Sequence, residues 1–463
     1  MTALLILFFT ALAALFAGLS KNRKSVQTIS LTGSLLALAS TVAGPVRGWD
    51  DMYASMLMFN DYAMAFSAVA ILSAALIFGL SGWGFRALTS TLGDNYGLIL
   101  FSLCGALCMF SSTNLVMLFL GIEILSIPLY VLAGSRRDDL RSNEAALKYF
   151  LMGSFATGIL LFGIALVYGS TGSFDFSAIG AAAAQGASMS GMLKAGVLLI
   201  VVGLSFKVSA APFHFWAPDV YTGSPSLVTA FMATVVKTAG FAAFFTLFAT
   251  AFAPVASVWT LPVSIIAGLT MTLANTTALF QDNFKRMMAY SSIAHAGYLL
   301  LAILSAENTS ADRALMFYLL SYSIATIGVF AVYIVVSEQK EDDTFAAFNG
   351  LGKTHPFLAV ALTVSVLSLA GVPPFPGFFG KYFLFTAVFD KYPALVVLAV
   401  INSAISIYYY FKVITAAWFQ KGSESDAEVV LPGGIRLTVS MALVLTAVLS
   451  AAPYLAFTLF FRN

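Results

Sequence analysis

The sequence predicts an all-α polytopic membrane protein with about 14 transmembrane helices. Hydrophobic residues make up 60% of the 463 positions and charged residues only 10%, which is less than half the charge of a usual soluble domain. Many apolar runs exceed the roughly 18 residues that indicate a transmembrane helix. Lysine and arginine also fall unevenly on alternate loops, as they do in polytopic membrane proteins.

The expected spans follow the apolar runs in chain order. They cover approximately residues 1–20, 26–44, 60–84, 95–111, 113–133, 144–168, 192–216, 226–252, 257–278, 287–305, 313–337, 356–388, 391–419 and 437–458. Proline and glycine interrupt the seventh and the twelfth of these spans, so we expect a broken helix in each.

Basic residues in the loops predict the orientation of the chain. The odd-numbered loops hold thirteen of them, namely Lys21, Arg23, Lys24, Arg86, Arg136, Arg137, Arg141, Lys285, Arg286, Lys340, Lys353, Lys421 and Arg436. The even-numbered loops hold four, namely Arg47, Lys194, Arg313 and Lys391. Because cytoplasmic loops carry the excess of Lys and Arg, both termini are expected on the non-cytoplasmic side.

The two interrupted spans share a pattern, which predicts an internal repeat. LSFKVSAAPFHFWAPDV and LAGVPPFPGFFGKYFLF each combine proline breaks, aromatic residues and one lysine, Lys207 or Lys381. Helix breakers in corresponding places of two halves are typical of transporters built from repeats. The spans lie five apart, an odd number, so the two five-helix repeats would be inverted. The expected units are residues 1–94 (helices 1–3), 95–252 (first repeat), 253–419 (second repeat) and 420–463 (a loop and the last helix).

Ionisable residues inside the spans predict function. A charge at the bilayer centre costs at least about 2.5–3.5 kcal/mol, so such residues usually face a bundle interior or water. Glu123 and one lysine could form a buried pair that only fixes packing. The spans hold too few acids, however, to neutralise five lysines in static pairs. The expected proton-translocation residues are Glu123, Lys207, Lys237, His295 and Lys381.

Four further residues are possible accessories, namely Glu144, Lys148, His214 and Lys412. Glu144 and Lys148 stand four apart on one helix, either as a helix-end ion pair or as a link between Glu123 and Lys207. Lys412 is positioned to extend its apolar stem toward the interface. His295 fits a proton relay or a core histidine.

A proline in a helix removes a backbone donor and frees a carbonyl one turn earlier. In hydrocarbon that carbonyl must find protein or water as a partner. The break beside Lys381 therefore predicts a hydrated pocket in which this lysine exchanges a proton. Asp219, after the earlier break, is expected to cap a helix or to line the mouth of a pocket.

Redox cofactors are not expected in this chain. Its two cysteines, Cys104 and Cys108, cannot supply the four ligands of an iron–sulfur cluster. A glycine-rich phosphate loop after a strand is also missing from the sequence. We therefore predict no catalytic redox residue, no cofactor-binding residue and no metal ligand in this chain.

Several long motifs resemble the antiporter-like membrane subunits of respiratory complex I. They are PFHFWAPDVYTGSPSLVTAFMATVVKTAGF, QDNFKRMMAYSSIAHAGYLL, SLAGVPPFPGFFGKYFLF, and LGIEILSIPLYVLAGSRRDD followed by SNEAALKYF. The resemblance covers roughly residues 95–419. Lysine rather than glutamate at position 381 favours the subunit N branch of the family over subunit M.

The resemblance implies a fourteen-helix fold with inverted repeats and a role in proton translocation driven by distant quinone reduction. Carried over by position, Glu123 matches the fifth-helix glutamate of the family, and Lys207, Lys237 and Lys381 match the lysines of helices seven, eight and twelve. His295 matches a tenth-helix histidine. The chain would be a non-redox subunit of NADH–quinone oxidoreductase in a bacterial-type inner (plasma) membrane.

The resemblance also implies partners, which are an antiporter-like subunit M and small subunits of the K and J type. Quinone, FMN and iron–sulfur clusters would sit in partner subunits. Two alternatives remain open. One is a subunit of a multi-subunit sodium/proton antiporter, and the other is a structural membrane-arm subunit with a silent channel.

Overall fold

The computed structural model describes residues 1–20, 22–44, 55–85, 92–185, 190–308, 310–422 and 430–460. Regular structure in these ranges is helical, and β pairing is limited to isolated bridges. The predicted all-α fold class is confirmed. Lys21, Arg47 and Arg86, which entered the orientation argument, lie outside the described residues.

The first half of the chain runs from α1 to α11. Its elements are α1 (Thr2–Gly18), α2 (Arg23–Ala43), α3 (Asp61–Gly84), α4 (Leu92–Ser111), α5 (Leu115–Ala133), α6 (Leu140–Thr171), α7 (Phe176–Ala184), α8 (Gly191–Lys207), α9 (Trp216–Gly223), α10 (Ser226–Phe231), the π-helical turn η3 (Met232–Val236) and α11 (Lys237–Thr250). The short helix α7 was not expected from the sequence, which placed a loop there.

The second half runs from η4 to α20. Its elements are η4 (Ala253–Val255), α12 (Ala256–Ala278), α13 (Phe284–Leu304), α14 (Ala311–Lys340), η5 (Phe345–Phe348), α15 (Leu351–Thr354), α16 (Pro356–Ala370), α17 (Pro376–Val388), α18 (Pro393–Phe419), α19 (Gly433–Ala451) and α20 (Leu455–Phe460). The two predicted interruptions are confirmed, between α8 and α9 and between α16 and α17.

Among the described residues, eleven helical segments are long and apolar enough to cross a membrane. The number is smaller than the predicted fourteen for local reasons. Helix α1 has only 17 residues, and both interrupted spans are divided into shorter helices. The count of fourteen and the inverted repeats stay predictions.

Polar side chains begin many of the helices. The side chains of Asn22, Asn60, Asn114, Asp139 and Asn283 each accept a hydrogen bond from a backbone N–H in the first turn of the helix that follows. Such caps satisfy donors that have no partner within the helix. The sequence thus sets the start of these helices locally, before any tertiary packing.

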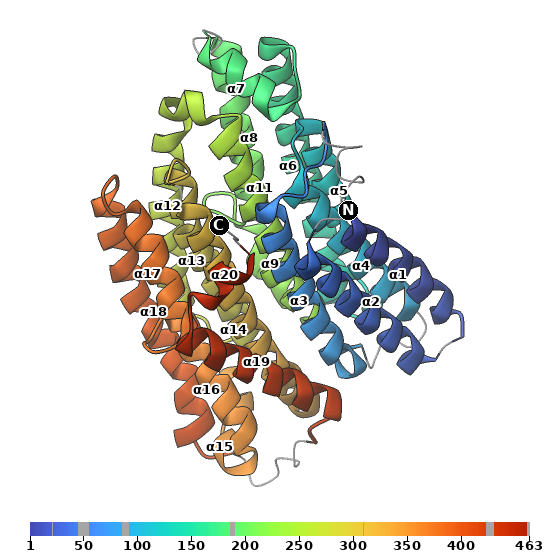
Figure 1. Ribbon diagram of the computed structural model, residues 1–463. Coiled ribbons are helices and arrows are strands. Elements are labelled where there is room, and N and C mark those ends of the chain that lie inside the picture. Colours follow the sequence, from blue (N-terminus) through green and yellow to red (C-terminus); the bar gives the residue numbers. More distant parts are fainter. Residues whose placement is uncertain are drawn as a thin grey trace.

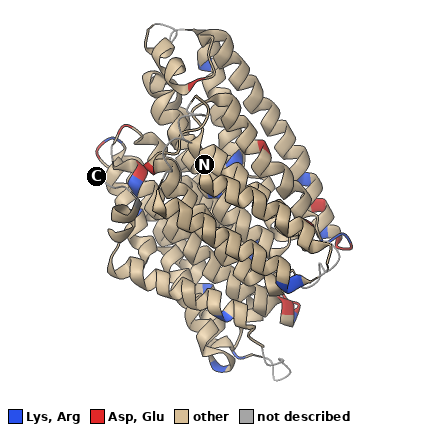
Figure 2. Cartoon of the chain, turned by 45° about the vertical axis from the view of Figure 1, so that its right-hand side comes forward, with Lys and Arg blue, Asp and Glu red and all other residues tan. Residues whose placement is uncertain are grey.

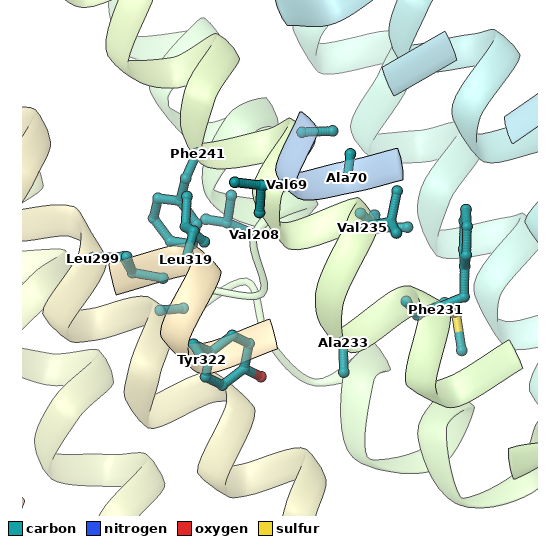
Figure 3. Packing of buried hydrophobic residues seen from close by; sticks show 14 of the residues in the cluster. Val69, Ala70, Val208, Phe231, Ala233, Val235, Phe241, Leu299, Leu319 and Tyr322 are labelled. Atoms are coloured by element: carbon teal, nitrogen blue, oxygen red, sulfur yellow. The ribbon is translucent and has the colours of Figure 1, made fainter. Parts of the chain in front are cut away.

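Helix α14 lies at the centre of the bundle (Figure 1). It packs against α3, α13, α16, α17 and α19, and the whole of its apolar window is buried. Figure 3 shows Val69, Phe241, Leu299 and Leu319, which come from α3, α11, α13 and α14, in one buried cluster. Close van der Waals packing of this kind holds helices together in a membrane.

The outer surface is mainly apolar. In the cartoon of Figure 2, Lys, Arg, Asp and Glu occupy only a small part of the helices. Large apolar side chains lie exposed on several outer helices, including Phe9, Phe155, Leu261, Val397 and Val444. A broad apolar surface is what lipid contact requires, and the chain is a polytopic membrane protein.

Candidate functional site: a buried polar axis

The first helix break places Lys207 at the last position of α8. Ser209, two residues later, has a positive φ of 58°, which turns the chain out of the helix. The backbone N–H of Ala211 then donates to Thr270 Oγ1 of α12 at 2.9 Å. The indole N–H of Trp216 donates to the Phe206 carbonyl oxygen at 3.0 Å. Protein partners therefore satisfy backbone groups on both sides of this break.

Lys207 and Glu123 have separate hydrogen-bond partners. Lys207 Nζ donates to Ser126 Oγ at 2.6 Å, and Ser126 stands three residues after Glu123 on α5. Glu123 Oε1 accepts from Thr157 Oγ1 of α6 at 3.0 Å. A direct ion pair between Glu123 and Lys207, one form of the packing pair that the sequence left open, is not seen between these two described residues. The packing of α5, α6 and α8 places hydroxyl groups beside both.

A cavity of about 20 Å³ adjoins Lys207. Its polar lining comes from Ser126, Tyr130, Tyr149, Thr157 and Lys207. The Tyr149 hydroxyl is buried and has no hydrogen-bond partner within the described part of the chain. A space of this size holds one water molecule, and the lining offers more than the two polar partners that such a water needs.

Lys237 begins α11 directly after the π-helical turn η3. Its side chain is only 2% exposed, and Nζ donates to the Ser292 carbonyl oxygen of α13. The Ser292 hydroxyl in turn accepts from Tyr322 of α14 at 2.9 Å. A π turn widens a helix locally and often occurs at functional sites. Its presence was not visible in the sequence.

His295 sits between two tyrosines. Its Nδ1 lies 2.7 Å from Tyr318 Oη of α14, and its Nε2 lies 3.2 Å from Tyr410 Oη of α18. Tyr410 Oη also lies 2.5 Å from Ser291 Oγ. Both ring nitrogens therefore have hydroxyl partners, which is an arrangement that can pass a proton in either direction between Tyr318 of α14 and Tyr410 of α18.

The second break explains the surroundings of Lys381. Helix α16 ends at Ala370, and Gly371 continues with a φ of +81° that favours glycine. Lys381 Nζ donates to the freed Ala370 carbonyl oxygen at 2.9 Å and to Ser403 Oγ of α18 at 2.8 Å. The ammonium thus lies at the C-terminal end of α16, where the helix dipole favours a cation.

Lys381 also lines a larger cavity between α17 and α18. This cavity has a volume of about 410 Å³, and Phe378, Tyr382, Val400 and Ser403 are among its other lining residues. Tyr382 and Val400 are half exposed, at 53% each, so the cavity reaches the outer face of the bundle. The break beside Lys381 therefore adjoins a cavity, whereas the predicted hydration of this pocket and proton exchange by Lys381 stay predictions.

The accessory pair Glu144 and Lys148 belongs to a surface ion-pair network. Lys148 Nζ lies 2.7 Å from Glu144 Oε1 and 2.7 Å from Asp219 Oδ2, and Arg286 Nη1 lies 2.8 Å from Asp219 Oδ1. Asp219 therefore ties α9 to α6 and α13, rather than only capping a helix. Partial burial raises its pKa, but the hydrogen bonds from Lys148 and Arg286 outweigh that effect and lower the pKa below its usual value.

The remaining predicted accessories lie outside this network. His214 is buried in the first break. Lys412 donates to the Leu279 carbonyl oxygen at the end of α12 at 2.7 Å and lies beside the Tyr408 ring. Sequence reasoning missed Lys285, which was counted as a loop residue. Lys285 is 4% exposed and donates to the Ser224 carbonyl oxygen. It belongs to α13, which begins at Phe284, and not to the preceding loop.

Three of the five predicted translocation residues meet at α13. Lys237 bonds to Ser292 of this helix, and His295 is part of it. Lys381 Nζ lies over the ring of Tyr298, 5.2 Å from its centroid. The structure thus brings Lys237, His295 and Lys381 to a single helix face. Lys207 and Glu123 form a second group around α5, α6 and α8.

A family described as "NADH:quinone oxidoreductase/Mrp antiporter, TM" matches residues 112–406. The chain belongs to this family. A relative in it, NADH-quinone oxidoreductase subunit N of Cytophaga hutchinsonii, is 44% identical over 406 residues, which cover 87% of this chain and 86% of the relative. Subunit N of Flavobacterium psychrophilum is 39% identical over 98% of both chains. The predicted resemblance to the subunit N branch of the antiporter family is confirmed.

Two solved structures share the fold. A chain of respiratory complex I from Thermus thermophilus with bound aureothin superposes with a TM-score of 0.81 at 35% identity, and the match covers 97% of each chain. A chain of the Mrp complex from Dietzia sp. has a TM-score of 0.83 at 20% identity, covering 99% of this chain and 96% of that chain. The second likeness concerns the fold alone.

Proposed function

We propose that this chain is a proton-translocating, non-redox subunit of a complex I-type NADH–quinone oxidoreductase. The observation that carries the proposal is the convergence of Lys237, His295 and Lys381 on α13. Buried ionisable residues in a membrane bundle mark ion pathways, and these three have hydroxyl, carbonyl or aromatic partners instead of carboxylates. Their charge is therefore free to change without breaking an ion pair.

The proposed path begins at Glu123 and Lys207 and continues through Lys237 and His295 to Lys381. Hydroxyl groups stand at several steps, with Ser126 beside Lys207, Thr157 beside Glu123, and Tyr318 and Tyr410 beside His295. The water-sized cavity beside Lys207 adds room for a bridging water. Reduction of quinone in partner subunits would supply the free energy that shifts charge along this path.

Membership of the family supports the wider setting of the proposal. The relatives named subunit N favour an assembly with subunit M and with K- and J-type subunits, in which FMN, iron–sulfur clusters and quinone belong to other chains. A bacterial-type inner membrane, with both termini on the non-cytoplasmic side, completes the proposal. The two breaks further favour inverted repeats over residues 95–252 and 253–419.

The two breaks are alike in one physical respect. Lys207 ends α8, and Lys381 donates to the last carbonyl of α16, so each cation lies at the C-terminus of a half-helix. The two lysines differ in position, because Lys207 precedes the first break and Lys381 follows the second break. This difference constrains how the proposed repeats would superpose.

Separate Lys207→Ala and Lys381→Ala variants test the proposal in the assembled complex in membrane vesicles. Quinone reduction and proton uptake are measured side by side, and assembly is measured from the amount of intact complex. We expect loss of proton uptake or of turnover with full assembly. Lys391→Ala is the matched control, because Lys391 is exposed and paired with Glu307. Unchanged proton uptake in both the Lys207 and the Lys381 variants would refute the proposal and would favour the alternative of a structural subunit.

A further inference from the structure

A buried network of amide and hydroxyl groups lies next to Lys381 without touching its ammonium. Its centre is Asn275 of α12, which is completely buried. Asn275 Nδ2 donates to Tyr298 Oη at 3.0 Å and to the Met271 carbonyl oxygen at 2.8 Å. Asn275 Oδ1 accepts from Tyr409 Oη at 3.0 Å. One side chain therefore links α12 to α13 and α18.

The network reaches Lys381 from two sides. On α13, Asn275 holds Tyr298, whose ring faces Lys381 Nζ at 5.2 Å from the ring centroid. On α18, Asn402 lies 3.5 Å from Asn275 Nδ2 and directly precedes Ser403, the hydroxyl acceptor of Lys381. Asn275 thus contacts Tyr298, whose ring faces the ammonium, and Asn402, whose chain neighbour Ser403 accepts a hydrogen bond from the ammonium.

Buried polar groups are costly unless every donor and acceptor has a partner. Asn275 achieves this by donating its two Nδ2 hydrogens to Met271 and Tyr298 and by accepting from Tyr409 at Oδ1, and Asn402 Oδ1 makes a longer contact of 3.5 Å with the same nitrogen. An apolar side chain at position 275 would itself need no such partners, although it would remove the partner that Asn275 offers to Tyr298 and Tyr409. A buried asparagine at this position therefore needs a reason, and the positions of Tyr298, Asn402 and Tyr409 that it fixes supply one.

We propose that Asn275 is a positioning residue for Lys381, holding the Tyr298 ring and the Asn402–Ser403 turn of α18 against the lysine ammonium. An aromatic face stabilises a cation that lies over it, and a hydroxyl acceptor stabilises it further. Asn275 therefore sets how readily Lys381 holds its proton. The consequence for proton translocation rests on the proposed function, whereas the consequence for Lys381 itself does not.

Other titratable groups near Lys381 must stay constant in a test. They are Tyr382 on α17 itself, His295 and Tyr298 on α13, Tyr318 on α14, and Tyr409 and Tyr410 on α18, while α16 carries none and Arg436 of α19 lies in the first turn of that helix. Replacing Asn275 removes none of these groups. It changes how Tyr298, Tyr409 and Asn402 are held.

The test is the pH dependence of Lys381 acylation by a small amine-selective reagent, measured by mass spectrometry on the intact complex in membranes. Only the neutral amine reacts. In Asn275→Leu we expect acylation of Lys381 at neutral pH to rise by about three- to tenfold, from the usual strength of a cation–π contact. Thr276→Leu is the matched control, since Thr276 is the next residue, is exposed and bonds only to its own helix.

Tyr298→Phe provides a second variant that breaks the same hydrogen bond from the other end and keeps the ring. We expect a change in the same direction and of smaller size, and this variant decides the matter if Asn275→Leu does not assemble. Unchanged Lys381 acylation in the variants that assemble would overturn the positioning role. Normal proton uptake in Lys381→Ala would instead refute the proposed function, and acylation would still decide the role of Asn275.

Discussion

Gly377 lies where α17 returns closest to the end of α16, and its substitution tests the role of the break. Its backbone N–H donates to Ser368 Oγ at 3.2 Å. A Cβ added at Gly377 would overlap the Ser368 carbonyl oxygen, well inside the 3.0 Å that real Cβ atoms keep. Because that oxygen belongs to the backbone, a rotamer change cannot relieve the overlap. The first turn of α17 must therefore move outward by about 1 Å in Gly377→Ala.

Lys381 lies one turn further along α17 and moves with it. Its hydrogen bonds to Ala370 and Ser403, at 2.9 and 2.8 Å, would lengthen beyond the range in which they count as hydrogen bonds. A misplacement of about 1 Å in a working group commonly reduces a rate by about 10²-fold. We therefore expect Gly377→Ala to lower proton uptake coupled to quinone reduction by about that factor.

A graded series makes this prediction specific. Gly158, in α6, has open space around an added Cβ, and an added Cβ at Gly380 would lie 3.1 Å from both Ser321 Oγ and Tyr318 Cδ2. Alanine at position 158 should have no effect, at position 380 a small effect, and at position 377 a large one. Assembly and proton uptake are measured for each variant in vesicles. Normal uptake in an assembled Gly377→Ala complex would refute the idea that the break positions Lys381.

Two further predictions concern the cavity beside Lys207 and the ion-pair network around Asp219. Tyr149→Phe should slow proton uptake several-fold without loss of assembly, because it removes the unpartnered hydroxyl that lines the small cavity. The control is Tyr168→Phe, on the exposed side of α6. Equal rates of proton uptake in the two variants would contradict a role for the cavity. Asp219→Asn should lower the thermal stability of the complex slightly at pH 7. The pKa of Asp219 is depressed, so the stabilisation is present above the unfolded value of about 3.9 and disappears as pH falls below it. Melting temperatures of both forms at neutral and acidic pH check this, and a difference that grows on acidification would contradict it.

The sequence alone determined the helical architecture and the positions of the breaks. Long apolar runs can only be helices in a bilayer. The end of α16 follows from Gly371, and the interruption after α8 follows from Pro212 nearby. The ionisable residues within the spans were also visible, because each is an exception to an apolar pattern. These features depend on neighbours within about one turn, which a single sequence displays directly.

The tertiary structure decided which groups each ionisable residue meets. Each partner comes from a different helix than the residue that it meets. This holds for Ser126 beside Lys207, for Ser292 beside Lys237 and for the two tyrosines beside His295. The contact between Lys207 and Ser126 joins positions 81 residues apart, and no local pattern encodes such a pairing. The burial of Lys285 and the role of Asn275 were missed for the same reason. Helix packing brings their partners together, and only the folded chain fixes that packing.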